Sequence, residues 1–537
     1  MKVHLALLFL FFATFGFSQE SEFIAGMLMD SKTNEPVVFA TIGVKGKVLG
    51  VVSNQDGSFR IPKRFKEMGE TLEISCLGYE KKEVLLTDLY PIKNNIVKLV
   101  PSVLKLEEAI LIGRQKKPPS PRKIIKRAIE KISINYPFEP FSYIGYYRDY
   151  QEKDDKYLNL NEAILKVFDA GFDKNDYLTT QSQIFDSNEN LDFVRDSYTN
   201  ISYNYLTGNK IIDNAKLLSF GGNEFYILRI HNAIRNYNVM TFSYVDVFEK
   251  DLIKNHSLTR KNDVLLGDEK MFVIGLESSN HSFINDGYTK HITTGNIKSE
   301  GEIYISQSSY AIHKIVYKMF DYTESKKPKK RNDNKSPKLL YEIAIEYKKY
   351  KGKMYPNYLS LHNAFKVKKT HFRIEEIVFE IKKKRFVIKT NNPPIFVVQP
   401  GQPNVLLSYK KKKIDIKEVK NTYDGILVYP DDKQIDEILK ELELNNDRSE
   451  NIAIDLFHFE FSYIIDENGY TLNKFLYEEY SQYREFFTQR VITDSVTLPP
   501  NELLMRKDRP IFKNQPVSSP DNFSDYWMNT PLQNIDN

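Results

Sequence analysis

The 537-residue sequence has a single cysteine, so no internal disulfide framework can form. Cys76 follows Leu72 and Ile74 at alternate positions. We expect it to be a small buried hydrophobic residue on one face of a strand rather than a reactive thiol. Charge of one sign is also scarce: 76 Lys and Arg against 71 Asp and Glu leave a net charge of +5. This balance does not favour a nucleic-acid partner.

Common catalytic and nucleotide-binding motifs are absent from the sequence. It contains no Gly-x-Ser-x-Gly, no Walker A loop and no Gly-x-Gly-x-x-Gly after a strand. None of the nine histidines is followed by Glu at the His-x-x-Glu spacing that a zinc carboxypeptidase needs. The motifs therefore predict no catalytic residue, no metal ligand and no cofactor.

Long hydrophobic runs are missing except near the N-terminus. Lys2 precedes an apolar stretch of roughly a dozen residues that ends in Gly16-Phe17-Ser18, with small residues where signal peptidase reads. We predict a signal peptide over residues 1–18; a membrane anchor is the competing interpretation, although a spanning helix needs ~20 apolar residues. No later run reaches that length, and no Cys follows this one for lipidation. We therefore expect an exported protein, soluble or peripheral, in the periplasm or at the outer membrane.

Residues 19–101 contain short β-type runs separated by turn residues. This pattern predicts an immunoglobulin- or transthyretin-like β-sandwich of seven short antiparallel strands without helices. Inside it, Asn54-Gln55-Asp56-Gly57 predicts a tight turn, because Asn and Asp tolerate left-handed backbone and Gly has no Cβ. The alternative, a calcium loop, would need further oxygen ligands and a closing Glu, whereas Ser58-Phe59-Arg60 follow.

Three stretches of this region carry Asn-Glu-Pro, Asp-Gly-x-Phe and Leu-Gly-Tyr in order: IAGMLMDSKTNEPVVFATIGVKG, VVSNQDGSFRIP and LEISCLGYEKKEV. About residues 22–100 thereby resemble the carboxypeptidase regulatory-like module, a transthyretin-like sandwich common in exported proteins of Bacteroidetes. The resemblance implies a β-sandwich without peptidase chemistry. Cys76 departs from the pattern, which usually has a hydrophobic or aromatic residue there.

Residues 102–134 are interpreted as a linker followed by an amphipathic helix. Ser120 as N-cap and Pro121 at the first helical position predict a helix over 121–134. Alternating apolar and polar residues then predict a large antiparallel β-meander over 135–395, with a curved half-barrel as one possible form.

Parts of that β domain, such as AIEKISINYPFEPFSYIGYYRDY and YKKYKGKMYPNYLSLHNAF, resemble an uncharacterised periplasmic region. This region follows the regulatory-like module in many Bacteroidetes proteins. Some of those relatives continue into an outer-membrane barrel, which the residues past 400 do not predict here.

Residues 396–537 are interpreted as a mixed α/β region with a polar tail. DDKQIDEILKELEL predicts an amphipathic helix from about Asp431, and AIDLFHFEFSYII predicts a strand. LNKFLYEEYSQYREFFTQR predicts a second helix. Its apolar face would consist of Leu472, Phe475, Leu476, Tyr480, Tyr483 and Phe487. In the tail, Trp527 is expected to be the one large anchor.

A few side chains are candidates for chemistry. Arg148, Asp149 and Glu162 could belong to a hydrolase site of scattered carboxylates; the alternative is an ion pair across neighbouring strands. The Lys-rich segments 326–338 and 410–413 could contact anionic lipid, or could be a loop and a solvated strand end. The 34 tyrosines suit sheet faces that bind a glycan, a peptide or a protein, although cross-strand pairing explains many of them.

These observations together predict a non-enzymatic exported cell-envelope protein with a binding or assembly role. The expected partner is an envelope protein, glycan or peptide, with peripheral membrane contact as a further option. Two alternatives are a hydrolase acting on envelope or nutrient polymers and a surface adhesin component. Carboxylates converging in one deep pocket would favour the hydrolase, and a broad aromatic groove would favour binding.

Overall fold

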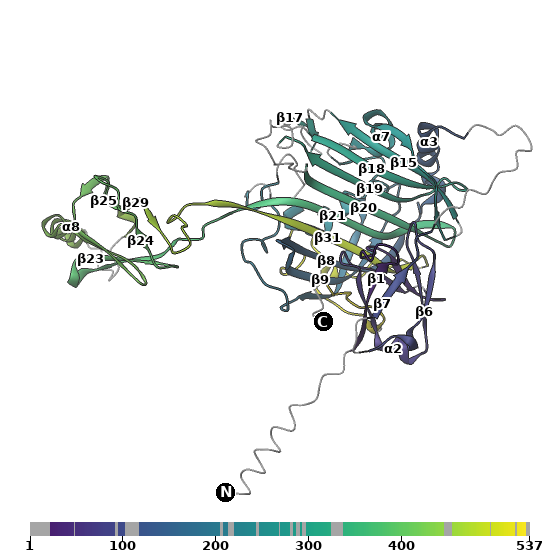
Figure 1. The fold of residues 1–537 in the computed structure, drawn as a ribbon, viewed down its shortest axis with the longest axis horizontal. Helices are drawn as coiled ribbons and strands as arrows, with labels where there is room; N and C mark the ends of the chain where they lie inside the picture. Colours follow the sequence, from purple (N-terminus) through teal and green to yellow (C-terminus); the bar gives the residue numbers. More distant parts are fainter. Residues whose placement is uncertain are drawn as a thin grey trace, which may run out of the picture. The chain divides into compact units, whose positions relative to one another are not determined.

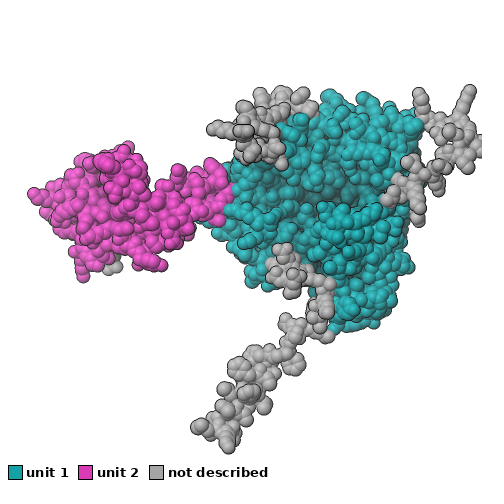
Figure 2. All heavy atoms as spheres, viewed as in Figure 1, with its two compact units in different colours: residues 1–366, 479–537 teal, residues 367–478 magenta. Residues whose placement is uncertain are grey.

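A computed structural model describes the chain from residue 22 to residue 532 with internal gaps. The gaps are 48, 92–94, 103–117, 205–207, 213–219, 243–245, 268, 280–282, 286–289, 293–296, 324–336, 445–453, 495 and 521–522. The chain divides into two compact units: residues 1–366 with 479–537, and residues 367–478 (Figure 2). Among the described residues, none of the helices combines the length and the apolar composition that a membrane span requires. The predicted signal peptide and most of the linker lie outside the described residues.

The N-terminal strands form the predicted seven-stranded β-sandwich (Figure 1). One sheet has the order β4-β1-β7, from β1 (Phe23–Asp30), β4 (Ser58–Pro62) and β7 (Asn95–Leu99). The other has the order β3-β2-β5-β6, from β2 (Thr41–Val44), β3 (Gly50–Val52), β5 (Thr71–Ser75) and β6 (Lys82–Leu85). Two details differ from the prediction: β1 and β7 are parallel, and a short helix, α2 (Lys63–Glu67), follows β4.

Two features that the sequence analysis singled out, Cys76 and the turn at Asn54–Gly57, lie in the sandwich. Cys76, just after β5, packs against this core, and burial raises the pKa of its thiol to about 11. The predicted turn is formed: Gly57 has φ +78°, and its N–H donates to the Asn54 carbonyl over 2.9 Å. Asp56 Oδ1 accepts from the backbone N–H of Ser58 at 2.9 Å. The Asp56 carboxylate is therefore used inside its own turn.

The largest element is an eleven-stranded sheet with the order β10-β9-β8-β31-β21-β20-β19-β18-β15-β13, and β14 pairs with β15. Its strands are β8 (Phe141–Lys153), β9 (Lys156–Asp169), β10 (Gln181–Glu189), β13 (Ser257–Arg260), β14 (Val264–Leu266), β15 (Glu269–Ser279), β18 (Ile297–Ser306), β19 (Ile312–Asp321), β20 (Lys338–Tyr350), β21 (Lys353–Lys369) and β31 (Leu476–Ile492). The described strands form an open path of mostly consecutive hairpins, which confirms the predicted large antiparallel sheet.

The predicted helix within LNKFLYEEYSQYREFFTQR is wrong, because this stretch forms β31. It pairs antiparallel with β8, and Arg484 lies opposite Asp149. From Tyr483 to Gln489 every residue is buried, so both faces of the strand are covered and its sequence does not alternate. Since β31 belongs to the large sheet, the sheet extends beyond the expected 135–395 domain.

The two faces of the large sheet are covered differently. What we call the helix face, which carries Tyr143 and Tyr147 of β8, packs against α3 (Pro121–Glu130), α6 (Glu224–Ile230) and α7 (Phe248–Asn255). The opposite sandwich face carries Ile144 and Tyr146 and packs against Val52 of the sandwich. The helix predicted at 121–134 is present as α3 followed by α4 (Ile132–Asn135).

The sandwich is held on the large sheet partly by the C-terminal segment. Phe39 stacks on Tyr358 of β21 with ring centroids 4.4 Å apart. After β31 the chain runs beside β10, where Val517 bridges Ile184. Trp527 then enters the sandwich core, and its Nε1–H donates to the Arg60 carbonyl over 2.9 Å. Trp527 is thus an anchor, as expected.

The second unit, residues 367–478, is inserted between β21 and β31 and has its own core. Its strands are β22 (Ile374–Glu380), β23 (Arg385–Thr390), β24 (Ile395–Phe396), β25 (Val405–Tyr409), β26 (Lys412–Ile414), β27 (Ile416–Thr422), β28 (Gly425–Pro430), β29 (Phe457–Phe461) and β30 (Ile464–Ile465). The helix predicted from about Asp431 is confirmed as α8 (Asp432–Leu444). The expected boundary at 395/396 falls inside this unit.

The lysine segments have different outcomes. Lys410 lies at the turn between β25 and β26 and pairs with Glu441 at 2.7 Å, which fits the solvated strand end. Most of 326–338 lies outside the described residues.

The other short strands and α-helix are α5 (Asp176–Thr179), β11 (Met240–Phe242), β12 (Asp246–Val247), β16 (Phe283–Asn285) and β17 (Lys290–Ile292).

Candidate functional site

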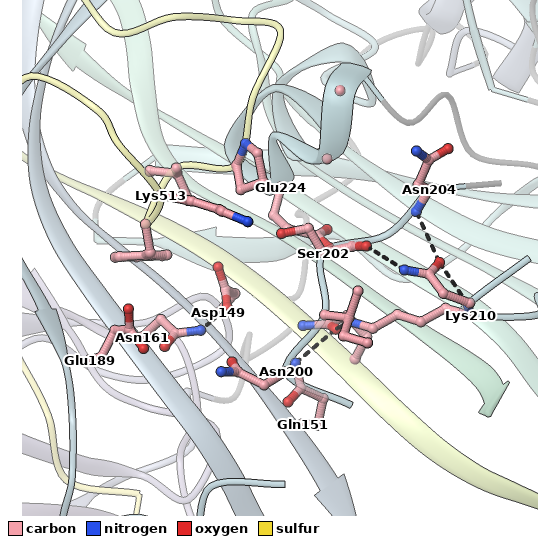
Figure 3. A pocket seen from close by; sticks show the side chains of 18 residues that line it. Asp149, Gln151, Asn161, Glu189, Asn200, Ser202, Asn204, Lys210, Glu224 and Lys513 are labelled. Atoms are coloured by element: carbon pink, nitrogen blue, oxygen red, sulfur yellow. Dashed lines mark hydrogen bonds between the residues drawn. The ribbon is translucent and has the colours of Figure 1, made fainter. Parts of the chain in front are cut away.

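A cavity of about 540 Å³ lies on the helix face of the large sheet (Figure 3). Strands β8, β9 and β31 supply one wall, and the start of α6 and the C-terminal segment supply others. The lining residues are mostly polar: Asp149, Gln151, Asn161, Glu189, Asn200, Ile201, Ser202, Asn204, Asn209, Lys210, Gly221, Gly222, Glu224, Gln482, Pro510, Ile511, Phe512 and Lys513. Small-molecule sites have volumes of this order.

Asp149 lies on the floor of the cavity because of the strand alternation of β8. A register shift between Asp149 and Gln151 marks a bulge at this point, and bulges re-aim side chains next to functional sites. Asp149 Oδ1 accepts from Asn161 Nδ2, and Oδ2 accepts from the Tyr147 hydroxyl, both at 2.9 Å. Burial, reinforced by the charge of Glu224, raises the pKa of Asp149 to about 6.

Lys210 is the buried cation of the cavity. Its Nζ donates to Gln482 Oε1 over 2.9 Å, and only 4% of the residue is exposed. Burial lowers the pKa of Lys210 to about 8, although the carboxylates of Glu224 and Asp149 favour the charged ammonium. The cavity thus holds an acid and an amine whose charges both change within about a unit of neutral pH.

Glu224 is the first residue of α6, and its carboxylate is already occupied. Oε1 accepts from the backbone N–H of Tyr203 at 2.8 Å, and Oε2 accepts from Arg484 Nε. Burial opposes ionisation, but Arg484 and Lys210 outweigh it and lower the pKa of Glu224. Glu224 therefore stays charged and holds α6 to the sheet.

The rim of the cavity combines a charge-paired side with an apolar side. Arg195 Nη2 donates to Asn161 Oδ1 at 2.8 Å and to Glu189 Oε2 at 2.9 Å, so the Glu189 charge is paired. On the other side, the Phe512 ring stacks on Tyr147, with an interplanar angle of 21°. In Figure 3, Lys513 and Lys210 extend toward the region of Asp149 from two sides.

The three candidates from the sequence do not meet in one site. Only Asp149 lines the cavity. Arg148 points to the sandwich face, where it pairs with Glu485 of β31 at 2.5 Å. Glu162 is on that same face and accepts from the Tyr146 hydroxyl at 2.6 Å. The cross-strand ion pair therefore holds for Arg148, and a hydrolase site built from all three residues does not form.

Sequence reasoning missed Lys210, Glu224 and Gln482. Lys210 precedes α6 and Glu224 begins it, and neither belongs to a sequence motif. Gln482 lies in the stretch for which the sequence predicts a helix. A correct assignment of β31 as a strand beside β8 was the one available signal, because it would have placed Gln482 opposite Gln151.

Comparisons with known proteins cover only part of the chain. Residues 24–111 match the CarboxypepD_reg-like domain family, which supports the resemblance of the N-terminal sandwich. No curated protein matched the sequence. Among solved structures, a LolA superfamily protein from Nitrosomonas europaea has 12% identity and a TM-score of 0.18, with 46% of this chain and 86% of that chain covered.

A putative outer membrane lipoprotein-sorting protein domain from Vibrio parahaemolyticus has 11% identity and a TM-score of 0.18, with 44% of this chain and 84% of that chain covered. Likenesses at such TM-scores carry no argument about the fold or the function of this chain.

Proposed function

We propose that the protein is a non-enzymatic, exported binding protein of the bacterial cell envelope, and that the cavity of about 540 Å³ on the helix face is its ligand site. The observation that supports the site is a floor of buried polar side chains, fixed by internal hydrogen bonds, that adjoins open space. Buried polar groups normally pack without such space. A preorganised polar cavity is typical of binding sites for small molecules.

A hydrolase is the second candidate, because three carboxylates line the cavity, of which Glu189 is paired with Arg195. Asp149, with a pKa of about 6, has the acidity that suits a general base near neutral pH. Glu224, however, is held by Arg484 and by the Tyr203 backbone and cannot readily act as the second acid. Binding therefore explains the arrangement with fewer assumptions than hydrolysis.

Small molecules that copurify with the protein test the ligand site. The full chain and its Lys210→Met variant are purified from the native host. Each protein is heated to release bound small molecules, which mass spectrometry identifies. Lys348→Met is the matched control, because Lys348 also has a pKa lowered to about 8 by burial but does not line the cavity. We expect a compound that is retained by the wild type and the control and lost from Lys210→Met.

Equal amounts of every compound on all three proteins would contradict a ligand site in the cavity. Turnover of the retained compound by the wild type, lost in Asp149→Asn, would establish the hydrolase instead.

N-terminal sequencing tests export separately: we expect a mature chain that begins near Gln19 in the periplasmic or outer-membrane fraction. An intact Met1 on a cytoplasmic protein would contradict export.

A further inference from the structure

The cavity lining is rich in uncharged groups that both donate and accept hydrogen bonds. Six side-chain amides line it: Gln151, Asn161, Asn200, Asn204, Asn209 and Gln482. An amide carries donors and acceptors side by side, as a hydroxyl group does, so the two match each other. An anion site would gather cations without carboxylates, whereas the two lining lysines, Lys210 and Lys513, share this cavity with three carboxylates. The lining chemistry thus suits a ligand that carries several hydroxyl groups.

The charged groups of the cavity are close to balanced, because Lys210, Lys513, Arg195 and Arg484 stand against the carboxylates of Asp149, Glu189 and Glu224. Glu189 and Glu224 are paired with Arg195 and Arg484, respectively. The third carboxylate, that of Asp149, has no ion-pair partner within hydrogen-bond distance among the described residues. Its two hydrogen bonds come from neutral groups, the Asn161 amide and the Tyr147 hydroxyl. A neutral ligand avoids the desolvation penalty that an unpaired ligand charge would bring into this buried site.

Asp149 and Lys210 keep bonding capacity for a ligand. Each oxygen of the Asp149 carboxylate accepts one described hydrogen bond, while an ionised carboxylate has about four acceptor sites in all. Lys210 makes one described side-chain hydrogen bond, to Gln482, although an ammonium group carries three donors. An acceptor and a donor thus face the same cavity.

We propose that the cavity binds a sugar-like molecule through two adjacent hydroxyl groups. One hydroxyl donates its hydrogen to the Asp149 carboxylate, and its neighbour accepts from the Lys210 ammonium. This inference rests on the proposed binding function and names the ligand class of that site.

The apolar side of the cavity completes the match to a sugar ring. Phe512 and Ile511 line it, and the stacking of Phe512 on Tyr147 keeps its ring in one orientation. One face of a pyranose ring presents C–H groups, which pack on aromatic and aliphatic side chains while the hydroxyls turn to polar groups. An amino acid or short peptide could also bridge Asp149 and Lys210 with its charged ends. Titration with alanine and alanyl-alanine distinguishes this ligand class from sugars.

Direct binding measurements test the ligand class. The full chain is titrated by calorimetry with methyl glucoside, methyl galactoside, methyl mannoside and N-acetylglucosamine, and in parallel with alanine and alanyl-alanine. We expect at least one sugar to bind and neither alanine compound to bind. Asp149→Asn and Lys210→Met should each weaken sugar binding tenfold or more, since hydrogen bonds to charged groups are the stronger ones.

Matched controls separate the cavity from general damage. Asp186→Asn and Lys348→Met alter groups whose pKa values are also shifted by burial but which do not line the cavity, and affinity should change less than twofold. Monodeoxy sugars that lack one of the two bound hydroxyls should lose as much affinity as Asp149→Asn. Combining that deoxy sugar with Asp149→Asn should add little further loss, because the same hydrogen bond is missing.

The outcomes distinguish the ligand class from the binding function. If the alanine compounds bind and Lys210→Met abolishes that binding, the sugar-like class is wrong while the binding site stands. If sugars bind equally well to Lys210→Met and Asp149→Asn, the proposed contacts are wrong. If no tested compound binds and no compound depends on Lys210 in copurification, both proposals fail.

Discussion

Neighbouring residues of β8 place a buried charge on each face of the large sheet, and the two charges have different surroundings. On the sandwich face, Arg148 has no exposed surface and pairs with Glu485, itself 1% exposed. On the helix face, Asp149 is 4% exposed but borders the cavity. Both residues are buried and charged. Burial and charge therefore do not by themselves mark a site; open space and unused bonding capacity do.

The sandwich face is also covered by segments that are distant from β8 along the chain. Tyr526 and Val52 belong to the same buried cluster as Tyr146. Thr530 donates to Glu162 Oε1 at 2.8 Å. The charged groups of this face are therefore shielded by the sandwich and by the C-terminal segment together. We expect variants on this face to change stability, and variants on the helix face to change binding and the pH dependence.

The largest effect is expected from Arg148→Met. Removing the guanidinium leaves Glu485 buried without its charge partner, and we expect a loss of about 3–5 kcal/mol in the free energy of unfolding. Urea denaturation measures the change. The double variant Arg148→Met/Glu485→Met should recover most of the stability, because no charge then remains buried.

Lys45→Met is the control for that variant. Lys45 and Glu83 form an exposed ion pair at 2.6 Å, so its loss should leave the stability nearly unchanged. Equal losses for Arg148→Met and Lys45→Met would remove the distinction between the buried pair and an ordinary surface pair.

Trp527→Ala should come next, with a loss of about 3 kcal/mol, at the lower end of large-to-small core changes. The side chain is buried beside Phe65 of the sandwich, with ring centroids 5.7 Å apart. Thermal unfolding measures the loss, and Trp527→Phe should retain part of the stability. Since Trp527 is the only tryptophan, its fluorescence in the wild type also reports release of the C-terminal segment. An unchanged melting temperature would show that the segment does not complete the sandwich core.

Asp149→Asn should have an effect that depends on pH. Because the folded-state pKa is raised from 3.8 to about 6, Asp149 contributes stability that is fully present below about pH 4 and is lost as the pH rises through 6. Relative to the wild type, Asp149→Asn should gain on the order of 2–3 kcal/mol between pH 4 and pH 7 at ~1.4 kcal/mol per pKa unit. Urea denaturation over this range measures the gain. Parallel pH profiles for the two proteins would contradict a raised pKa.

Asp56→Ala should have a smaller effect than Asp149→Asn, about 1 kcal/mol. It removes the hydrogen bond from the Ser58 backbone to Oδ1, but it also removes Oδ2, which is buried and has no hydrogen-bond partner among the described residues. Thermal unfolding with and without calcium measures the change, and calcium should not alter the melting temperature of either protein. A calcium-dependent shift in the wild type that disappears in Asp56→Ala would mean that the turn is a cation site.

Sequence reasoning reached the elements whose signal is local. The seven strands of the sandwich, the Asn54–Gly57 turn, α3 and α8 each depend on turn residues, caps or periodicity within one short stretch. β31 was assigned wrongly because a strand buried on both faces has no alternation, and its apolar residues happen to recur at helical spacing. Of the site, only Asp149 was singled out, and its partners were not.

Side-chain periodicity along the backbone is enough to predict the N-terminal sandwich, the antiparallel character of the large sheet and the helices α3 and α8. Which face of β8 carries a cavity depends on how the sheet assembles. Lys210 and Gln482 are 272 residues apart, and Arg148 and Glu485 are 337 residues apart. Such polar pairs leave no period in the sequence, because each contact depends on how strands distant along the chain align when the sheet assembles.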